Sequence, residues 1–119
     1  MRWFVEPETE RLDLGDGAWI EVKSELTYAE QKKLDAASIN QIGGLGDPDA
    51  RLEVDYARLP LVRMLTWIVD WSLTDGDNKP VPVDMAHIEI LRAPAVAAIN
   101  AALDKHITEV VAKNVPTPS

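Results

Sequence analysis

The segment LPLVRMLTWIVDW, residues 59–71, is apolar over most of its length. On a helix, its polar residues Arg63, Thr66 and Asp70 would lie within about 60° of one another, because successive side chains turn by about 100°. Nearly all of the remaining helix surface would have to be buried. The segment therefore predicts a central core helix, and Pro60 fits its first turn, where a missing amide hydrogen does little harm.

The residues before this segment contain a hairpin signal and a helix start. Apolar residues alternate with polar ones on both sides of Gly15-Asp16-Gly17 and predict a β-hairpin over residues of about 10–23. Thr27 and Glu30 have the spacing of a capping box, so we expect a helix from residue 28 to about residue 42.

Two short stretches connect this helix to the core segment. Residues 43–49 are rich in glycine and aspartate, and we expect a mobile loop that separates two helical halves of the chain. Residues 51–57 alternate apolar and polar side chains, which predicts either a short strand or an extended lead-in to the core helix.

The C-terminal third is predicted to be helical. Asp84 is placed to cap a short helix over residues of about 85–91, and Pro94 opens a last helix over residues of about 94–112. Residues 114–119 contain two prolines and predict a flexible tail. The apolar stripe of the last helix follows a spacing of 3, 4, 4 and 3 residues and consists of Val96, Ile99, Leu103, Ile107 and Val110.

Taken together, these elements predict one domain over residues 1–113. We expect a mainly α member of the α+β class, a small helical domain of about four helices with an N-terminal β-hairpin. The chain has 119 residues, of which 46% are hydrophobic, and this is enough for one modest core.

The overall composition argues against several classes of partner. Twelve basic and 20 acidic residues give a net charge of −8, which would repel the phosphates of nucleic acids. The chain has no cysteine, so neither disulfides nor thiolate metal sites are expected. The sequence shows neither a signal peptide nor a membrane span.

No pattern of reactive residues predicts catalysis. Residues 75–78 resemble the start of a calcium loop, but the twelfth position, where such a loop needs glutamate, is Ala86. His87 and His106 fall on different predicted helices. The sequence has neither a G-x-S-x-G motif nor a glycine-rich phosphate loop. We therefore expect a protein that is not an enzyme and has no catalytic residues, cofactor or bound metal.

Two apolar faces have two interpretations each. Met64, Trp67 and Trp71 share one side of the predicted core helix, where they either fill the core or anchor a partner protein. The stripe of the last helix, with Ile99, Leu103 and Ile107, either packs on its own domain or binds in a partner's groove. These six residues are the candidate partner-binding residues.

Most of the chain resembles the small tail assembly chaperones encoded in the tail gene clusters of long-tailed phages and prophages. The resemblance covers the hairpin, the capped helix start, the end of the core segment, the link after it and the closing helix. The matching stretches are residues 14–22 (LGDGAWIEV), 26–30 (LTYAE), 68–75 (IVDWSLTD), 79–83 (KPVPV) and 104–106 (DKH).

The resemblance implies a protein of the host bacterial cytoplasm that coats the tape measure protein and helps to recruit tail tube subunits during assembly. Such chaperones are absent from the finished virion, and their genes commonly yield a second, longer product by frameshifting. An extension of that kind would attach at residues 115–119. The alternative is a structural virion protein, either associated with the tail tube or part of the head–tail connector. The sequence does not determine the oligomeric state, and a homo-oligomer is compatible with it.

Overall fold

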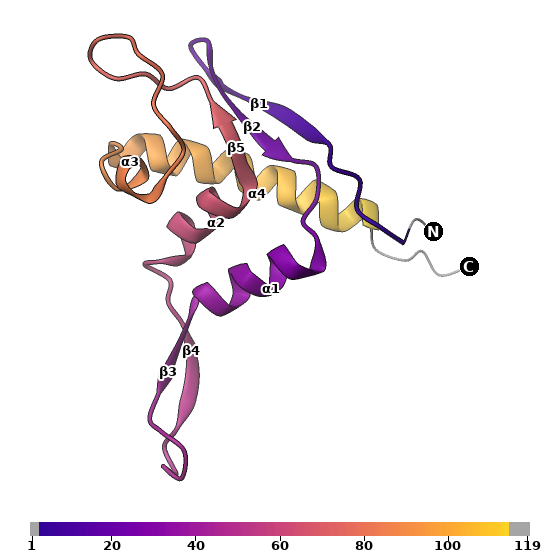
Figure 1. Ribbon diagram of the computed structural model, residues 1–119, viewed down its shortest axis with the longest axis vertical. Helices are drawn as coiled ribbons and strands as arrows, with labels where there is room; N and C mark the ends of the chain where they lie inside the picture. Colours follow the sequence, from indigo (N-terminus) through magenta and orange to yellow (C-terminus); the bar gives the residue numbers. More distant parts are fainter. Residues whose placement is uncertain (1–2, 115–119) are drawn as a thin grey trace.

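The N-terminal hairpin forms as the sequence predicts in the computed structural model, which describes residues 3–114 (Figure 1). Strands β1 (Thr9–Gly15) and β2 (Ala18–Lys23) pair antiparallel. The turn between them holds Asp16 at a φ of 52° and Gly17 at a φ of 80°. This left-handed backbone is what a two-residue hairpin turn requires.

The prediction of a single core helix over residues 59–71 is wrong. Helix α2 (Leu59–Trp67) is followed directly by strand β5 (Ile68–Trp71), which pairs with the free edge of β2 to give a sheet of order β1-β2-β5. The β-branched side chains of Ile68 and Val69 favour extended backbone. An apolar run suits a buried helix and a buried strand equally, so its periodicity did not reveal the change.

The helix predicted over residues 28–42 is also too long. Helix α1 (Tyr28–Ala37) has the predicted capping box, but it ends at Ser38, whose hydroxyl donates to the carbonyl oxygen of Leu34 at 2.9 Å. The chain then forms strand β3 (Ile39–Ile42).

Strand β3 pairs antiparallel with β4 (Arg51–Val54), so residues 51–54 are a strand and not merely a lead-in. Residues 43–49 lie in the connection between these strands and do not separate two helical halves. With two antiparallel sheets, 41% helix and 24% strand, the molecule is an α+β protein, and the mainly α assignment is contradicted.

The C-terminal helices lie close to their predicted positions. Helix α3 (Met85–Glu89) is capped by Asp84, whose carboxylate accepts from the backbone N–H of His87, and it ends two residues earlier than expected. Helix α4 (Ala93–Asn114) is longer than predicted at both ends. Its last residue is the first residue of the predicted flexible tail, and residues 115–119 lie outside the described part of the chain.

The core forms where α2, α3 and α4 pack together against the three-stranded sheet. An ion pair of 2.6 Å between Arg63 and Asp104 connects α2 to α4 at the edge of this core. The buried apolar side chains of the main cluster are Ile20, Val22, Met64, Trp67, Ile68, Trp71, Ile88, Ile99 and Leu103.

One histidine is buried in this core and connects α4 to the hairpin. His106 places Nε2 at 2.9 Å from the carbonyl oxygen of Lys23. A carbonyl can only accept, so Nε2 carries the hydrogen. The other ring nitrogen, Nδ1, lies 3.5 Å from a carboxylate oxygen of Glu10, and Trp67 packs edge-on against the ring with centroids 5.5 Å apart. The imidazole therefore joins α4, α2 and both strands of the hairpin.

Candidate interaction site: the β3–β4 arm

The residues predicted to bind a partner lie in and around the core. Five of the six, Met64, Trp67, Trp71, Ile99 and Leu103, are buried members of the main cluster, and Ile107 is half-buried against it. The structure brings the two predicted faces together, because α2 packs on α4. Their role in partner binding stays a prediction, and in this conformation a partner could reach the five buried residues only after the core had opened.

Four of the exposed large apolar side chains, Ile39, Leu45, Leu52 and Val54, lie together on an arm that projects from the body, while the others are spread over the rest of the described residues. We define the arm as β3, β4 and the loop between them, residues 39–54; Figure 1 shows it extending away from the sheet and from α4. The molecule measures 54 × 43 × 20 Å, and its radius of gyration is 16.9 Å. A compact chain of this length would have a radius of gyration of about 13.5 Å, so the shape is extended.

The two faces of the arm differ in chemistry. Paired residues of an antiparallel ladder share a face, and the register pairs Ile39 with Val54 and Gln41 with Leu52. We call this side the apolar face; Ile39, Leu52 and Val54 are all exposed on it, with Leu52 69% exposed. The opposite face contains Arg51 and Glu53, whose side chains form an ion pair of 2.6 Å.

The loop of the arm depends on one glycine. Gly43 has a φ of 82°, and a Cβ at this position would lie 2.7 Å from a carboxylate oxygen of Asp47 and 3.0 Å from the Cα of Ala50. Any other residue would be strained in its backbone and crowded at its side chain. The chain therefore turns tightly at the end of β3, and Leu45 stands fully exposed in the loop.

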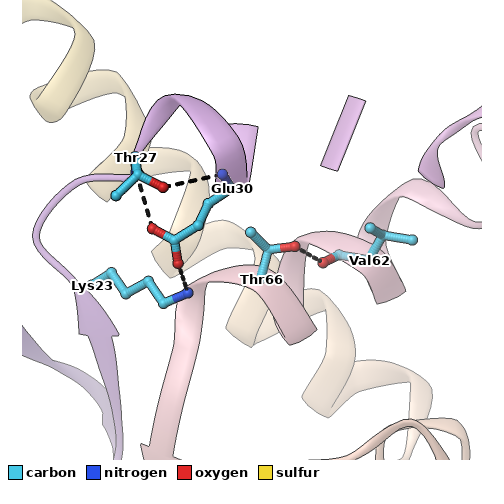
Figure 2. A network of polar contacts seen from close by, with 5 residues as sticks. All are labelled: Lys23, Thr27, Glu30, Val62 and Thr66. Atoms are coloured by element: carbon cyan, nitrogen blue, oxygen red, sulfur yellow. Dashed lines mark hydrogen bonds and ion pairs between the residues drawn. The ribbon is translucent and has the colours of Figure 1, made fainter. Parts of the chain in front are cut away.

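A polar network fixes the helix from which the arm extends (Figure 2). Thr27 Oγ accepts from the backbone N–H of Glu30 at 3.1 Å, and the Glu30 carboxylate accepts from the backbone N–H of Thr27 at 3.0 Å. The same carboxylate pairs with the ammonium group of Lys23 on β2. Lys23 first, and then the backbone N–H of Thr27, lower the pKa of Glu30 below its usual value. These contacts hold the start of α1 to β2.

Figure 2 also shows a second polar contact, close to the end of α2. The hydroxyl of Thr66 donates to the carbonyl oxygen of Val62 at 2.8 Å, one turn earlier in the helix. This bond satisfies the hydroxyl group within the helix. Thr66, one of the three polar residues of the predicted stripe, therefore does not need a hydrogen bond from water. The helix ends one residue later, where the chain enters β5.

The groups considered for metal binding are engaged in local structure. Asp75 accepts from the backbone N–H groups of Asp77 and Lys79 and so closes its own turn. Asp84 accepts from the backbone N–H and the ring of His87, and both contacts lower the pKa of Asp84. Within residues 3–114, no three histidine or acidic side chains come together in a group that could hold a metal ion.

No protein family, curated protein or solved structure matches this chain in sequence or in fold. Among the helices of residues 3–114, none is long and apolar enough to span a membrane.

The arm was not predicted as a hairpin, although its signals are present in the sequence. Ile39 and Ile42 are β-branched, Gly43 follows them directly, and residues 51–54 alternate apolar and polar side chains. Two short extended segments on either side of a glycine-rich turn are typical of a hairpin. The capping box at Thr27 favoured a longer helix and hid this signal.

Proposed function

We propose that the protein is a non-catalytic chaperone of phage tail assembly that holds the tape measure protein through the apolar face of its arm. The observation that carries the proposal is the apolar face itself: Ile39, Leu52 and Val54 are exposed on a projection that adds nothing to the protein's own core. The resemblance to tail assembly chaperones supplies the client.

The dimensions of the arm suit an amphipathic helix as the bound element. Four residues of strand span about 13 Å, which is a little more than two turns of a helix. A client helix with apolar residues at i, i+4 and i+7 would cover the apolar face. The protein's charge of −8 favours a client with basic residues beside its apolar stripe and keeps the complex soluble.

The test is co-expression with the tape measure protein encoded in the same tail gene cluster. We expect the chain to keep that protein soluble and to co-purify with it. Ile39→Ser, on the apolar face, is expected to lower the co-purified amount severalfold. Ile90→Ser is the matched control. It also replaces an exposed isoleucine with serine, but at the C-terminal end of α3, outside the arm. Equal binding by both variants would contradict the role of the arm.

A second measurement addresses the alternative of a structural virion protein. A chaperone acts before the tail is complete, so mass spectrometry of purified virions should find at most traces of this chain. Abundant copies in mature particles would overturn the chaperone proposal in favour of the structural role.

A further inference from the structure

The outer edge of β4 is open, and its hydrogen-bonding groups can be assigned. The arm's sheet has two strands within the described residues, so β4 has β3 on one side only. The backbone N–H of Asp55 donates to the carbonyl oxygen of Ser38 at 2.7 Å. Bonded and non-bonded pairs alternate along an antiparallel ladder. Arg51 and Glu53 therefore bond to β3, while the N–H and C=O groups of Leu52 and Val54 point to the open edge.

An isolated two-stranded hairpin with an exposed apolar face is marginally stable in water, and an open edge is a template for another strand. The sequence of β4 is suited to a strand identical to itself. In an antiparallel pair centred on Leu52, each Leu52 lies opposite its own copy, and Arg51 of each copy lies opposite Glu53 of the other. Two opposite-charge pairs then flank an apolar pair, and each contact stabilises the sheet.

Charge favours the register centred on Leu52 over its two neighbours, although the register centred on Glu53 would also place Arg51 opposite Asp55. Residues whose backbone N–H and C=O groups point to the open edge must lie opposite one another. The twofold axis can therefore move only to positions at which Leu52 and Val54 still form hydrogen bonds across the new pair. A pair centred on Glu53 places two carboxylates directly opposite each other, and a pair centred on Arg51 does the same with two guanidinium groups. Like charges in that position are destabilising. The other edge of the arm is formed by β3. Its residues Asn40, Gln41 and Ile42 are uncharged, so two copies of β3 could not form the charge pairs that two copies of β4 can.

We propose that two copies of the chain join their arms edge to edge through β4, with Leu52 at the twofold axis. The joint sheet has the strand order β3-β4-β4-β3, and the apolar faces of both arms form one continuous surface. The arms project from the bodies (Figure 1), so the two bodies of charge −8 stay apart, and salt screens their repulsion beyond about 8 Å. This inference does not depend on the tail assembly role.

Cysteine cross-linking tests the register directly, because the natural chain has no cysteine. Directly opposed, bonded residues have Cα atoms about 5.5 Å apart, within the range of about 4.4–6.8 Å that a disulfide spans. We expect Leu52→Cys to form a disulfide-linked dimer under mild oxidation. Gln41→Cys is the matched control, since it exposes a cysteine on the same face of the neighbouring strand. Equal cross-linking of both variants would overturn the register.

Charge reversal tests the pairing without a disulfide. In sedimentation measurements on the full chain, we expect a reversible dimer, and Arg51→Glu or Glu53→Arg alone should raise its dissociation constant about tenfold or more, because two attractive pairs become repulsive. The double variant Arg51→Glu with Glu53→Arg should restore it, as should mixing the two single variants. Lys33→Glu on α1 changes the net charge as Arg51→Glu does and should leave dimerisation unchanged.

The results separate this proposal from the proposed function. A chain that is monomeric into the millimolar range, or single charge reversals without effect on the dimer, would overturn the proposal. Ile39 lies on β3, away from the β4 edge. A loss of client binding in Ile39→Ser with an intact dimer would therefore support the proposed function and would leave the dimer proposal unchanged. A loss of the dimer in Arg51→Glu with client binding retained would support pairing through the β4 edge and would show that client binding does not need the dimer.

Discussion

Replacing Trp67 by alanine is the sharpest test of where the core lies. The residue is 3% exposed and packs edge-on against His106. An aromatic side chain buries about 150–250 Å², which at about 25 cal/mol per Å² stabilises the fold by about 4–6 kcal/mol. The ring contact adds about 0.5–1.5 kcal/mol.

One term acts in the opposite direction. The Nε1 of Trp67 is buried and has no hydrogen-bond partner among the described residues, and removing such a group relieves a penalty of about 1–3 kcal/mol. Alanine also keeps a small part of the buried surface. We therefore expect Trp67→Ala to lower the free energy of unfolding by about 3–5 kcal/mol, the range found when large aromatic core residues are truncated.

The measurement is urea unfolding followed by far-ultraviolet circular dichroism, which does not rely on tryptophan fluorescence. Trp3→Ala is the matched control, because Trp3 is 84% exposed and its loss should change the free energy of unfolding by less than about 0.5 kcal/mol. A loss below about 1 kcal/mol for Trp67→Ala, with an unchanged dependence on urea, would refute the assignment of Trp67 to the core.

Two further predictions concern single side chains. Lys23 and the capping contacts lower the pKa of Glu30, so its ionised form stabilises the fold; this contribution is complete above the unfolded pKa and is lost as the pH falls through the folded one. Glu30→Gln should thus lower the free energy of unfolding by about 1 kcal/mol at pH 7, and the difference from the natural protein should shrink when unfolding is measured below about pH 4. Gly17→Ala should destabilise by about 1 kcal/mol in thermal unfolding, because Gly17 has a φ of 80° with open space around it. Gly76→Ala, also in open space but without a left-handed φ, should leave the melting temperature nearly unchanged, and equal effects of the two would contradict the reasoning.

Local signals in the sequence predicted the elements that local chemistry controls. The turn at Asp16 and Gly17, the capping box at Thr27, the cap at Asp84 and the stripe of α4 all depend on residues within a few positions of one another. Such features are visible in a single sequence because their hydrogen bonds and backbone angles are satisfied locally. The hairpin and the starts of the helices were accordingly predicted well.

The two points where a helix gives way to a strand were not predicted. At Ile39 and at Ile68 the chain leaves a helix and pairs with another strand, the nearby β4 in the first case and the distant β2 in the second. Strand pairing supplies hydrogen bonds that local periodicity does not show. The candidate site, which is built on β3 and β4, was missed because the capping box at Thr27 favoured a helix that continued through the residues of β3.

The sequence by itself determined an acidic chain with an N-terminal hairpin, a capped helix after it and a long amphipathic helix at its C-terminal end, since each of these depends on near neighbours. Only the tertiary structure decided which apolar residues are buried. The same kind of side chain fills the core at Trp67 and stands exposed at Leu52, because burial depends on what the rest of the fold places next to each residue.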